Sequence, residues 1–314
     1  MTPVVTITGG SGFVGQLLRR GLSEDGWDVR VFDPFRGRLV DAVRRRWLAT
    51  AGSRPGRLGG RAIRRTQARA ERALVRAGAI RRGPDDILAE PDAIAARFAG
   101  SQAVIHLAGI PHPHQPGATD ADFVRLNYDA AVSVFAAAQA AGVRTFVFAS
   151  SAQVYRINAP LRLEQLPILE TNPLPLPAEG QTTYGFLKAA FERHLDGACA
   201  AGPTQAVALR LEYPGFRSTT HHNLYVSTSV ENLVAGFRCA VRPPADLAFG
   251  AFNLADAWVD PAIVDIQAFV RATYPYVPCH AEGNACLLST GLAQAVLGYR
   301  PAAHGHYVDE ALVW

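Results

Sequence analysis

The chain has 314 residues, of which 49% are apolar, so it is long enough to bury a substantial core as one large domain or two closely joined ones. This composition excludes a disordered or fibrous protein. The net charge of +4 hides an asymmetry: residues 36–82 hold 15 Arg against Asp41 and Glu71, a local net charge of +13, whereas the other 16 basic and 25 acidic residues give the rest of the chain −9.

The first half of the chain alternates short β-branched runs with Ala-rich stretches, the pattern of a parallel sheet wrapped by helices. We expect strands at 4–8, 29–33, 103–107 and 145–150, and helices at about 122–141 and 184–199. The second half predicts strands at 206–211 and 251–254 and a helix from Pro261 to about Thr273. Thr228 and Glu231 have the spacing of a capping box, which predicts a further helix to about Val241.

The Arg-rich segment, about residues 37–83, is far longer than the usual connection between two strands. Leu39, Val43 and Trp47 share one helical face, which predicts an amphipathic helix within it. We interpret the segment as a solvated, helical, basic insertion after the second strand, with a phosphate or partner contact as the alternative. Nucleic-acid binding is disfavoured because no interleaved aromatic residues or reading motif accompany the charge.

Four widely spaced cysteines, with no C-x-x-C pair, indicate reduced thiols rather than a zinc site or a disulfide framework. No run approaches the length of about 18 apolar residues that a membrane span needs. The opening run Val4–Ile7 also lacks the basic start and longer apolar stretch of a signal peptide. These features predict a cytoplasmic protein.

A glycine-rich run, Thr8–Gly15 (TGGSGFVG), follows the first predicted strand and opens a helix. In this context, such a run is typical of a dinucleotide-binding turn, in which the glycines let the backbone approach a pyrophosphate at the helix N-terminus. We therefore expect the cofactor-binding residues to include those in and after this turn, namely Gly9, Gly12, Phe13, Val14 and Gly15.

An acidic residue ends the second predicted strand, 18 residues after Gly15. Asp33 at this position can accept hydrogen bonds from both hydroxyls of an adenosine ribose, and its charge repels a 2′-phosphate, so NAD is favoured over NADP. NADP stays an alternative cofactor, because Arg36 and Arg38 could bind a 2′-phosphate. The alternative for Asp33 is an ordinary strand-end or turn carboxylate before Pro34.

Tyr184 and Lys188 are four residues apart, which places a phenol and an ammonium on one face of the predicted helix. Taken alone, such a pair is usually a surface pair. Lys188, however, is the single lysine in a chain that uses Arg at its other 30 basic positions. A site that needs a compact, flexible donor rather than a planar fork explains this choice.

These motifs resemble the extended short-chain dehydrogenase/reductase family, the NAD-dependent epimerase/dehydratase group. The matching stretches are Thr8–Gly15, Val104–Ala108, Asn127, Phe146–Tyr155 and Tyr184–Lys188, with weaker matches at Leu209–Arg210 and Ala251–Leu254. The resemblance implies an α/β fold with a Rossmann-type, doubly wound parallel sheet in residues 1–205. It also implies a smaller, mixed substrate-binding portion in residues 206–314, interleaved with the first.

By this resemblance, the catalytic residues would be Ser151, Tyr184 and Lys188, with Ser150 as the rival serine. Tyr184 would act as general acid or base, Ser151 would hold the substrate oxygen, and Lys188 would also hold the nicotinamide ribose. An ammonium about 4 Å from the phenol contributes roughly 4 kcal/mol, or about three pKa units, toward the phenolate. Asn127 would help to order a proton-relay water, or else serve as a helix-packing amide.

The resemblance also places Leu107 and Ala108, and the loop that follows them, beside the cofactor. In the family, an Asp that opens the loop after the family's third strand touches the adenine. Asp86 is the best match for that position, with Asp85 as its neighbour and a solvated loop acid as the alternative.

In members of the resembled family that act on nucleotide sugars, a long stretch after the strand with the Leu-Arg pair supports the nucleotide. Only 17 residues separate Leu211 from Ser229 here, which leaves little room for such a support. The length of this segment resembles that of the uronate dehydrogenase type and predicts a small sugar-like or cyclic substrate. Substrate contacts are expected from Ser151 and from His112, His114, His222 and Arg217. For the three histidines and Arg217, a place on the protein surface is the alternative. No metal is expected, because no acidic residue accompanies the histidine pairs at ligand spacing.

The leading prediction is an NAD(P)-dependent oxidoreductase that moves a hydride between a secondary alcohol of a small molecule and nicotinamide. The alternatives are a sugar or nucleotide-sugar epimerase or dehydratase with bound NAD, and a non-catalytic NAD(P)-binding regulatory protein. A homodimer that pairs the helices at 122–141 and 184–199 is a family expectation.

Overall fold

The structure, a computed structural model, describes residues 2–34, 85–159, 162–200, 202–302 and 305–309. The expected Arg-rich insertion at about 37–83 lies outside the described residues, as do Arg36, Arg38 and the amphipathic helix expected around Trp47.

Six parallel strands form one sheet in the order β2-β1-β3-β4-β5-β6. They are β1 (Val4–Thr8), β2 (Asp28–Phe32), β3 (Ala103–His106), β4 (Thr145–Ser151), β5 (Gln205–Leu211) and β6 (Phe249–Leu254). The strand order reverses between β1 and β3, which is where ligands bind in open α/β sheets. The predicted Rossmann-type fold is confirmed, and the ends of the predicted strands differ from the observed ones by at most two residues.

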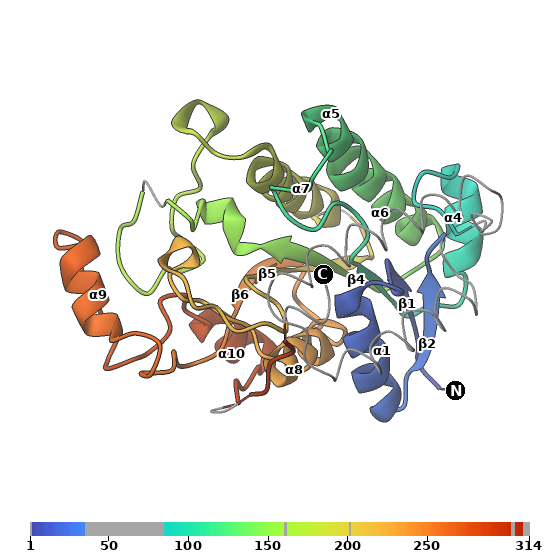
Figure 1. Cartoon of the computed structure of the whole chain (residues 1–314). Coiled ribbons are helices and arrows are strands. Elements are labelled where there is room, and N and C mark those ends of the chain that lie inside the picture. Colours follow the sequence, from blue (N-terminus) through green and yellow to red (C-terminus); the bar gives the residue numbers. More distant parts are fainter. Residues whose placement is uncertain (1, 35–84, 160–161, 201, 303–304, 310–314) are drawn as a thin grey trace.

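Helices cover both faces of the sheet (Figure 1). One face carries α1 (Phe13–Glu24), α8 (Val230–Ala240) and α10 (Gly291–Leu297), and the other carries α4 (Pro91–Phe98), α5 (Asp120–Phe123), α6 (Ala130–Ala140) and α7 (Thr183–Cys199). Each face has its own apolar core: Leu18 and Leu233 lie in the first, and Phe135 and Phe191 lie in the second. The central strands are therefore buried on both sides, as their continuous apolar runs require.

A smaller portion lies beyond the carboxyl ends of β4, β5 and β6 and includes α9 (Ile266–Thr273) (Figure 1). It packs around a separate core to which Ile168, Leu224 and Leu288 belong. Because β5 begins at Gln205 and both β5 and β6 belong to the main sheet, this portion and the nucleotide half share the sheet. The boundary near residue 205 stays a prediction.

The predicted capping box of Thr228 and Glu231 is wrong. Helix α8 starts at Val230 with Ser229 as its N-cap residue. The side chain of Thr228 is fully buried, with Oγ1 at 3.0 Å from the carbonyl oxygen of Glu212 and 2.9 Å from that of Leu254, and Glu231 contacts His306 instead. Thr228 thus joins the ends of β5 and β6, a tertiary role that outweighs the local motif.

Two helix boundaries also differ from the sequence prediction. The helix expected at 122–141 begins at Asp120, where the side chain of Thr119 forms a capping box with Asp122, and it contains a π-helical segment, η1 (Val124–Asp129). The helix expected from Pro261 begins at Ile266, because the Asp265 side chain caps it by accepting from the backbone N–H of Ala268. Both helices therefore start at a side chain that satisfies free N–H groups.

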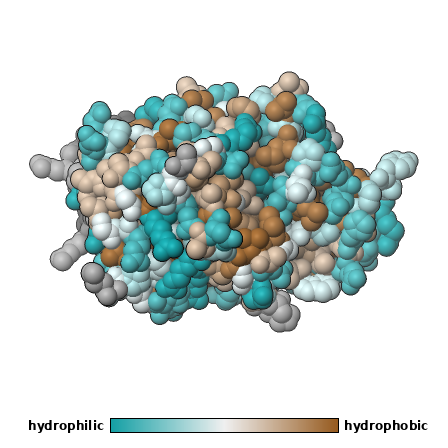
Figure 2. All heavy atoms as spheres, turned by 180° about the vertical axis from the view of Figure 1, so that it is seen from behind, coloured by the Kyte–Doolittle hydropathy of each residue, from teal (hydrophilic) through white to brown (hydrophobic). Residues whose placement is uncertain are grey.

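The rear surface mixes hydrophilic and hydrophobic residues (Figure 2). Among the described residues, no helix combines the length and the apolar character that a membrane crossing requires.

Candidate active site

The glycine turn lies between the end of β1 and the start of α1, against the segment that follows β3. Gly9 has a φ of +69°, and a Cβ atom there would lie 2.9 Å from the backbone nitrogen of Ala108. A Cβ on Gly15 would lie 2.6 Å from the Cα of Gly10. Gly12 is the N-cap residue of α1 and forms no side-chain capping bond. The N-terminus of α1 is the place where a dinucleotide phosphate would bind to backbone N–H groups. The turn fits the predicted cofactor.

A pair of glycine substitutions tests this close approach. Gly15→Ala should cost about 1–3 kcal/mol, because the methyl group would push against backbone that cannot easily move. If the displaced turn holds the cofactor, the affinity for NAD should fall roughly ten- to hundredfold. Gly197→Ala in α7 is the matched control, since its Cβ meets nothing within 4 Å and the helix gains up to about 1 kcal/mol. Calorimetry of NAD binding and of unfolding measures both effects; equal affinities for the two variants would contradict the assignment.

Asp33 follows β2 directly and is buried, with an exposed fraction of 6%. Its Oδ2 accepts a hydrogen bond from the backbone N–H of Ser11 at 3.1 Å, which ties the carboxylate to the glycine turn. The position beside the turn suits an acceptor for ribose hydroxyls. The other predicted contact on this side, Arg36, lies outside the described residues.

The remaining predicted cofactor contacts surround the same edge of the sheet. Leu107 and Ala108 follow β3 and hydrogen-bond to Thr8 through their backbone N–H groups, at 3.2 Å to its carbonyl and 3.3 Å to its Oγ1. The two neighbouring acids differ in their surroundings. Asp85 is buried and binds Arg97, whereas Asp86 is half-buried and accepts from the N–H of Leu88.

The three predicted catalytic side chains come together at the carboxyl end of β4. Ser151 is the last residue of β4, and Tyr184 and Lys188 lie on the first turns of α7. The Ser151 hydroxyl lies close enough to the Tyr184 phenol to lower its pKa. The rival, Ser150, faces away and donates to Glu192, so the structure places Ser151 and not Ser150 beside the phenol.

The electrostatics of this group differ from the expectation. Burial raises the pKa of Tyr184 well above its usual value, the nearby Ser151 hydroxyl lowers it in part, and Glu212 raises it further. Burial also lowers the pKa of Lys188 to about 8. The ammonium donates to the carbonyl oxygen of Ala149 at 2.7 Å and lies 5.6 Å from the centre of the Tyr184 ring. The predicted fall in the pKa of Tyr184 is therefore absent from this structure: burial has the largest effect, and Lys188 is not among the described groups that shift this pKa.

The loop after β3 lies over the phenol. The Tyr184 hydroxyl donates to the carbonyl oxygen of Pro111 at 3.1 Å. Asn127 in η1 holds the preceding residue through both ends of its amide, at 2.7 Å to the N–H and 3.0 Å to the carbonyl of Ile110. Asn127 thus shapes the loop that covers the site, and its part in ordering a relay water stays a prediction.

The predicted substrate contacts fall into two groups. His112 is half-buried and follows Pro111, whose carbonyl oxygen accepts from the phenol; burial, followed by the charge of His114, lowers the pKa of His112. His222 is exposed on the turn that begins after Thr220, with its ring 4.1 Å from that of His221. Among the described residues, no group of three or more His, Cys, Asp or Glu side chains could hold a metal ion.

Arg217 lines a cavity of about 590 Å³ between the segment after β5 and the segment after β6. Its guanidinium pairs with Asp260 and lies 4.7 Å from the ring of Tyr307. Ser218, Tyr225 and Trp258 are among the other lining residues. A cavity of this size can take a small organic ligand. A substrate carboxylate would have to compete with Asp260 for Arg217.

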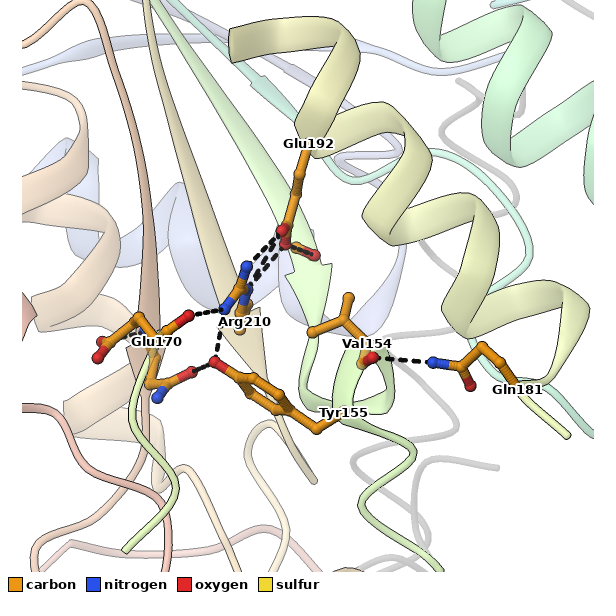
Figure 3. A network of polar contacts seen from close by, with 8 residues as sticks. Val154, Tyr155, Glu170, Gln181, Glu192 and Arg210 are labelled. Carbon is orange, nitrogen blue, oxygen red and sulfur yellow. Dashed lines mark hydrogen bonds and ion pairs between the residues drawn. The ribbon is translucent and has the colours of Figure 1, made fainter. Parts of the chain in front are cut away.

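Arg210 and Glu192 form a buried ion pair between β5 and α7 (Figure 3). Arg210 of β5 lies between α7 and the segment after β4, where it binds both carboxylate oxygens of Glu192 at 2.7–3.2 Å and donates to the hydroxyl of Tyr155. Tyr155 in turn donates to Asn253 of β6 at 2.8 Å. The network joins β5, β6, α7 and the segment after β4, and so fixes the helix that carries Tyr184 against the sheet.

One titratable side chain near the phenol was missed by the sequence interpretation. Glu212 follows β5 immediately and is buried, with an exposed fraction of 8%. Its charge acts on Tyr184, and the nearby amides of Gln153 and Asn223 lower the pKa of its carboxyl group in part. The available signal was an acidic residue directly after an apolar strand, at the edge where the carboxyl ends of parallel strands meet.

A doubly wound parallel sheet with a glycine turn between β1 and α1 defines a Rossmann-type α/β protein. The family model described as the NAD dependent epimerase/dehydratase family matches residues 5–216. The chain belongs to the NAD-dependent epimerase/dehydratase family.

Solved structures share the fold at low sequence identity. A short-chain dehydrogenase/reductase superfamily protein from Agrobacterium tumefaciens with bound NAD is 20% identical, with a TM-score of 0.61 over 95% of this chain and 92% of that chain. A UDP-glucose-4-epimerase from Stenotrophomonas maltophila with bound NAD and formylated UDP-arabinopyranose is 19% identical, with a TM-score of 0.62 over 100% and 96%. No curated protein matches the sequence.

Proposed function

We propose that the chain is an NAD-dependent oxidoreductase that moves a hydride between a secondary alcohol of a small, sugar-like or cyclic substrate and nicotinamide. The observation that carries this proposal is the placement of three side chains: Ser151 ends β4, and Tyr184 and Lys188 lie one turn apart at the start of α7, with the ammonium 5.6 Å from the centre of the Tyr184 ring. This group lies at the carboxyl edge of the same sheet that bears the glycine turn and Asp33. NAD bound as in several similar structures would supply the hydride acceptor.

The side chains of this chain would handle the proton and the positions of the reactants. Ser151 would hold the substrate hydroxyl, and Tyr184 would take its proton. Because burial raises the pKa of Tyr184, the phenol is a proton donor at neutral pH in this structure, which suits carbonyl reduction. Oxidation would require a positive charge nearer to the phenol, and Lys188 is the side chain placed to supply it. Asp33 would accept from the adenosine ribose.

A compact segment after β5 supports a small substrate. The N–H of Gly215 donates to the carbonyl oxygen of Thr228 at 2.7 Å, and the N–H of Ser218 donates to Ser227 Oγ at 2.8 Å, so the two ends of the 212–228 segment are joined. Phe216 in this segment stacks on Phe13 of α1, with ring centres 4.7 Å apart. The segment therefore packs inward instead of extending into a separate cradle.

Incubation with NAD and a panel of uronates, aldoses and polyols tests the proposal. We expect stoichiometric appearance of free NADH with at least one small polyhydroxylated substrate. Conversion of a substrate into an isomer without net NADH would overturn the dehydrogenase assignment.

The second candidate is an epimerase or dehydratase that returns the hydride to its substrate. Its support is the similarity to proteins whose names record UDP-sugar epimerases from Stenotrophomonas maltophila and Bifidobacterium longum. The same Ser151 and Tyr184 would serve it. UDP-sugars in the panel, followed by product analysis, distinguish this candidate from the first. NAD binding without any turnover would favour a regulatory protein.

The proposed partners are the small substrate and a second copy of the chain. The expected homodimer would pair α5 and α6 with α7, and light scattering of the purified protein measures its mass. Placement in the cytoplasm stays a prediction.

A further inference from the structure

Glu212 is a buried carboxyl group directly after β5, and its charge acts on Tyr184 of the proposed site. Leu211, the residue before it, is the register partner of Ser151, so Glu212 stands at the carboxyl edge of the sheet next to the turn that follows Ser151. Within the described part of the chain, no cation is among the groups that act on its carboxyl group. A buried carboxylate without a positive partner is costly, and such a group keeps its proton instead.

The neighbours of Glu212 come from three other elements. Gln153 belongs to the 3-10 helix η2 (Ala152–Tyr155) after β4, and Asn223 belongs to the 3-10 turn η4 (His221–Asn223). Both amides lie close enough to the carboxyl group to lower its pKa. Tyr184, from α7, is the titratable group on which the Glu212 charge acts. Burial raises the pKa of Glu212 to about 7, and the two amides limit the rise.

A buried side-chain oxygen without a hydrogen-bond partner is consistent with a protonated Glu212. Gln153 Oε1 is buried and has no hydrogen-bond partner among the described residues. Amide oxygen and nitrogen are nearly equivalent in shape, so a rotated Gln153 would present Oε1 to Glu212 and accept a hydrogen bond from a protonated carboxyl group. The backbone N–H of Gln153 donates to Ser151 Oγ at 3.1 Å, and a Cβ on Gly185 would lie 2.4 Å from the Gln153 carbonyl oxygen. Gln153 therefore connects Glu212 to the catalytic serine and to the start of α7.

We propose that Glu212 is a positioning residue of the hydride transfer: as a neutral acid it holds Gln153 and the turn after Ser151, and as a carboxylate it opposes loss of the Tyr184 proton. This inference rests on the proposed function. Ionisation of Glu212 above neutral pH adds a negative charge near the phenol and stabilises its protonated form. The rate of oxidation, which needs the phenolate, then rises only at higher pH. The rate of reduction, which needs the phenol, is kept to higher pH.

Infrared difference spectroscopy and pH–rate profiles of three proteins test this role: wild type, Glu212→Gln and the control Glu170→Gln. Burial also raises the pKa of Glu170, but this residue bonds to Asn253 and is not among the groups that act on Tyr184. We expect a carboxylic acid band that disappears near neutral pH in wild type and Glu170→Gln and is missing in Glu212→Gln. In Glu212→Gln, the rise of kcat/KM for alcohol oxidation should move to lower pH by about one unit.

An unchanged pH profile in folded Glu212→Gln would overturn the proposal, as would a Glu212 carboxyl group that is already ionised well below neutral pH. If Glu212→Gln fails to fold, isotope-labelled glutamate in the wild-type protein gives the infrared titration without a variant, and the same band decides. The infrared result does not depend on turnover. A neutral-pH titration of Glu212 in a protein that turns over no alcohol would therefore count against the proposed function, and not against the protonation of Glu212.

Discussion

Tyr184→Phe should lower kcat for hydride transfer by roughly 10²- to 10⁴-fold, the usual contribution of a general acid or base. The substitution removes one oxygen that contacts Ser151 and the Pro111 carbonyl, while the ring stays packed. The affinity for NAD should change little, because the predicted phosphate and adenosine contacts lie elsewhere on the sheet edge. Steady-state kinetics together with calorimetric titration of NAD separate the two effects.

Tyr299→Phe is a matched control for this substitution. Tyr299 is also buried, and its hydroxyl donates to a backbone carbonyl, that of Ala255, at the same distance of 3.1 Å. Both variants leave a carbonyl without its donor and should lose about 1–3 kcal/mol of stability. Only Tyr184→Phe should lose activity. Full activity in Tyr184→Phe would show that the catalytic assignment is wrong.

Arg210→Met should produce the largest loss of stability, about 3–5 kcal/mol in the free energy of unfolding. The side chains of Arg210 and Glu192 are only 7% and 5% exposed, so the substitution leaves a buried carboxylate without its partner. The double variant Arg210→Met/Glu192→Met should recover much of this loss, because it removes both charges. Urea denaturation of the single and double variants measures the difference.

An exposed pair gives the comparison for Arg210. Arg20 and Glu24 form an i,i+4 pair on α1 with side chains 85% and 57% exposed, and Arg20→Met should cost about 0.5 kcal/mol or less. If Arg210→Met were as mild as Arg20→Met, the network in Figure 3 would not stabilise the fold.

Local sequence patterns predicted most of the nucleotide half. Apolar strand runs and the glycine turn depend on neighbours in the chain, so β1 and the start of α1 follow from residues 4–15 alone. Composition singled out Lys188, because one lysine among many arginines indicates a special requirement. Features that depend only on neighbouring residues could therefore be predicted from the sequence.

Properties that arise from packing were not predictable in the same way. Thr228 has the spacing of a cap, yet the closure of β5 against β6 buries it elsewhere. The pKa of Tyr184 was expected to fall, but it rises because the surrounding loops remove water from the phenol. Glu212 looked like an ordinary residue after a strand, and only the folded chain places it beside Tyr184. Desolvation depends on residues far apart in sequence, which a linear motif does not record.

The most direct measurement of the proposed reaction follows a deuterium atom placed on the hydroxyl-bearing carbon of a turned-over small polyol or sugar. After reaction with NAD, mass spectrometry of the separated cofactor and product locates the label. The proposed oxidoreductase predicts deuterium in released NADH and a ketone or lactone product without it. Deuterium returned to the carbon of an isomerised product, with no labelled NADH released, would contradict the proposal and identify an epimerase.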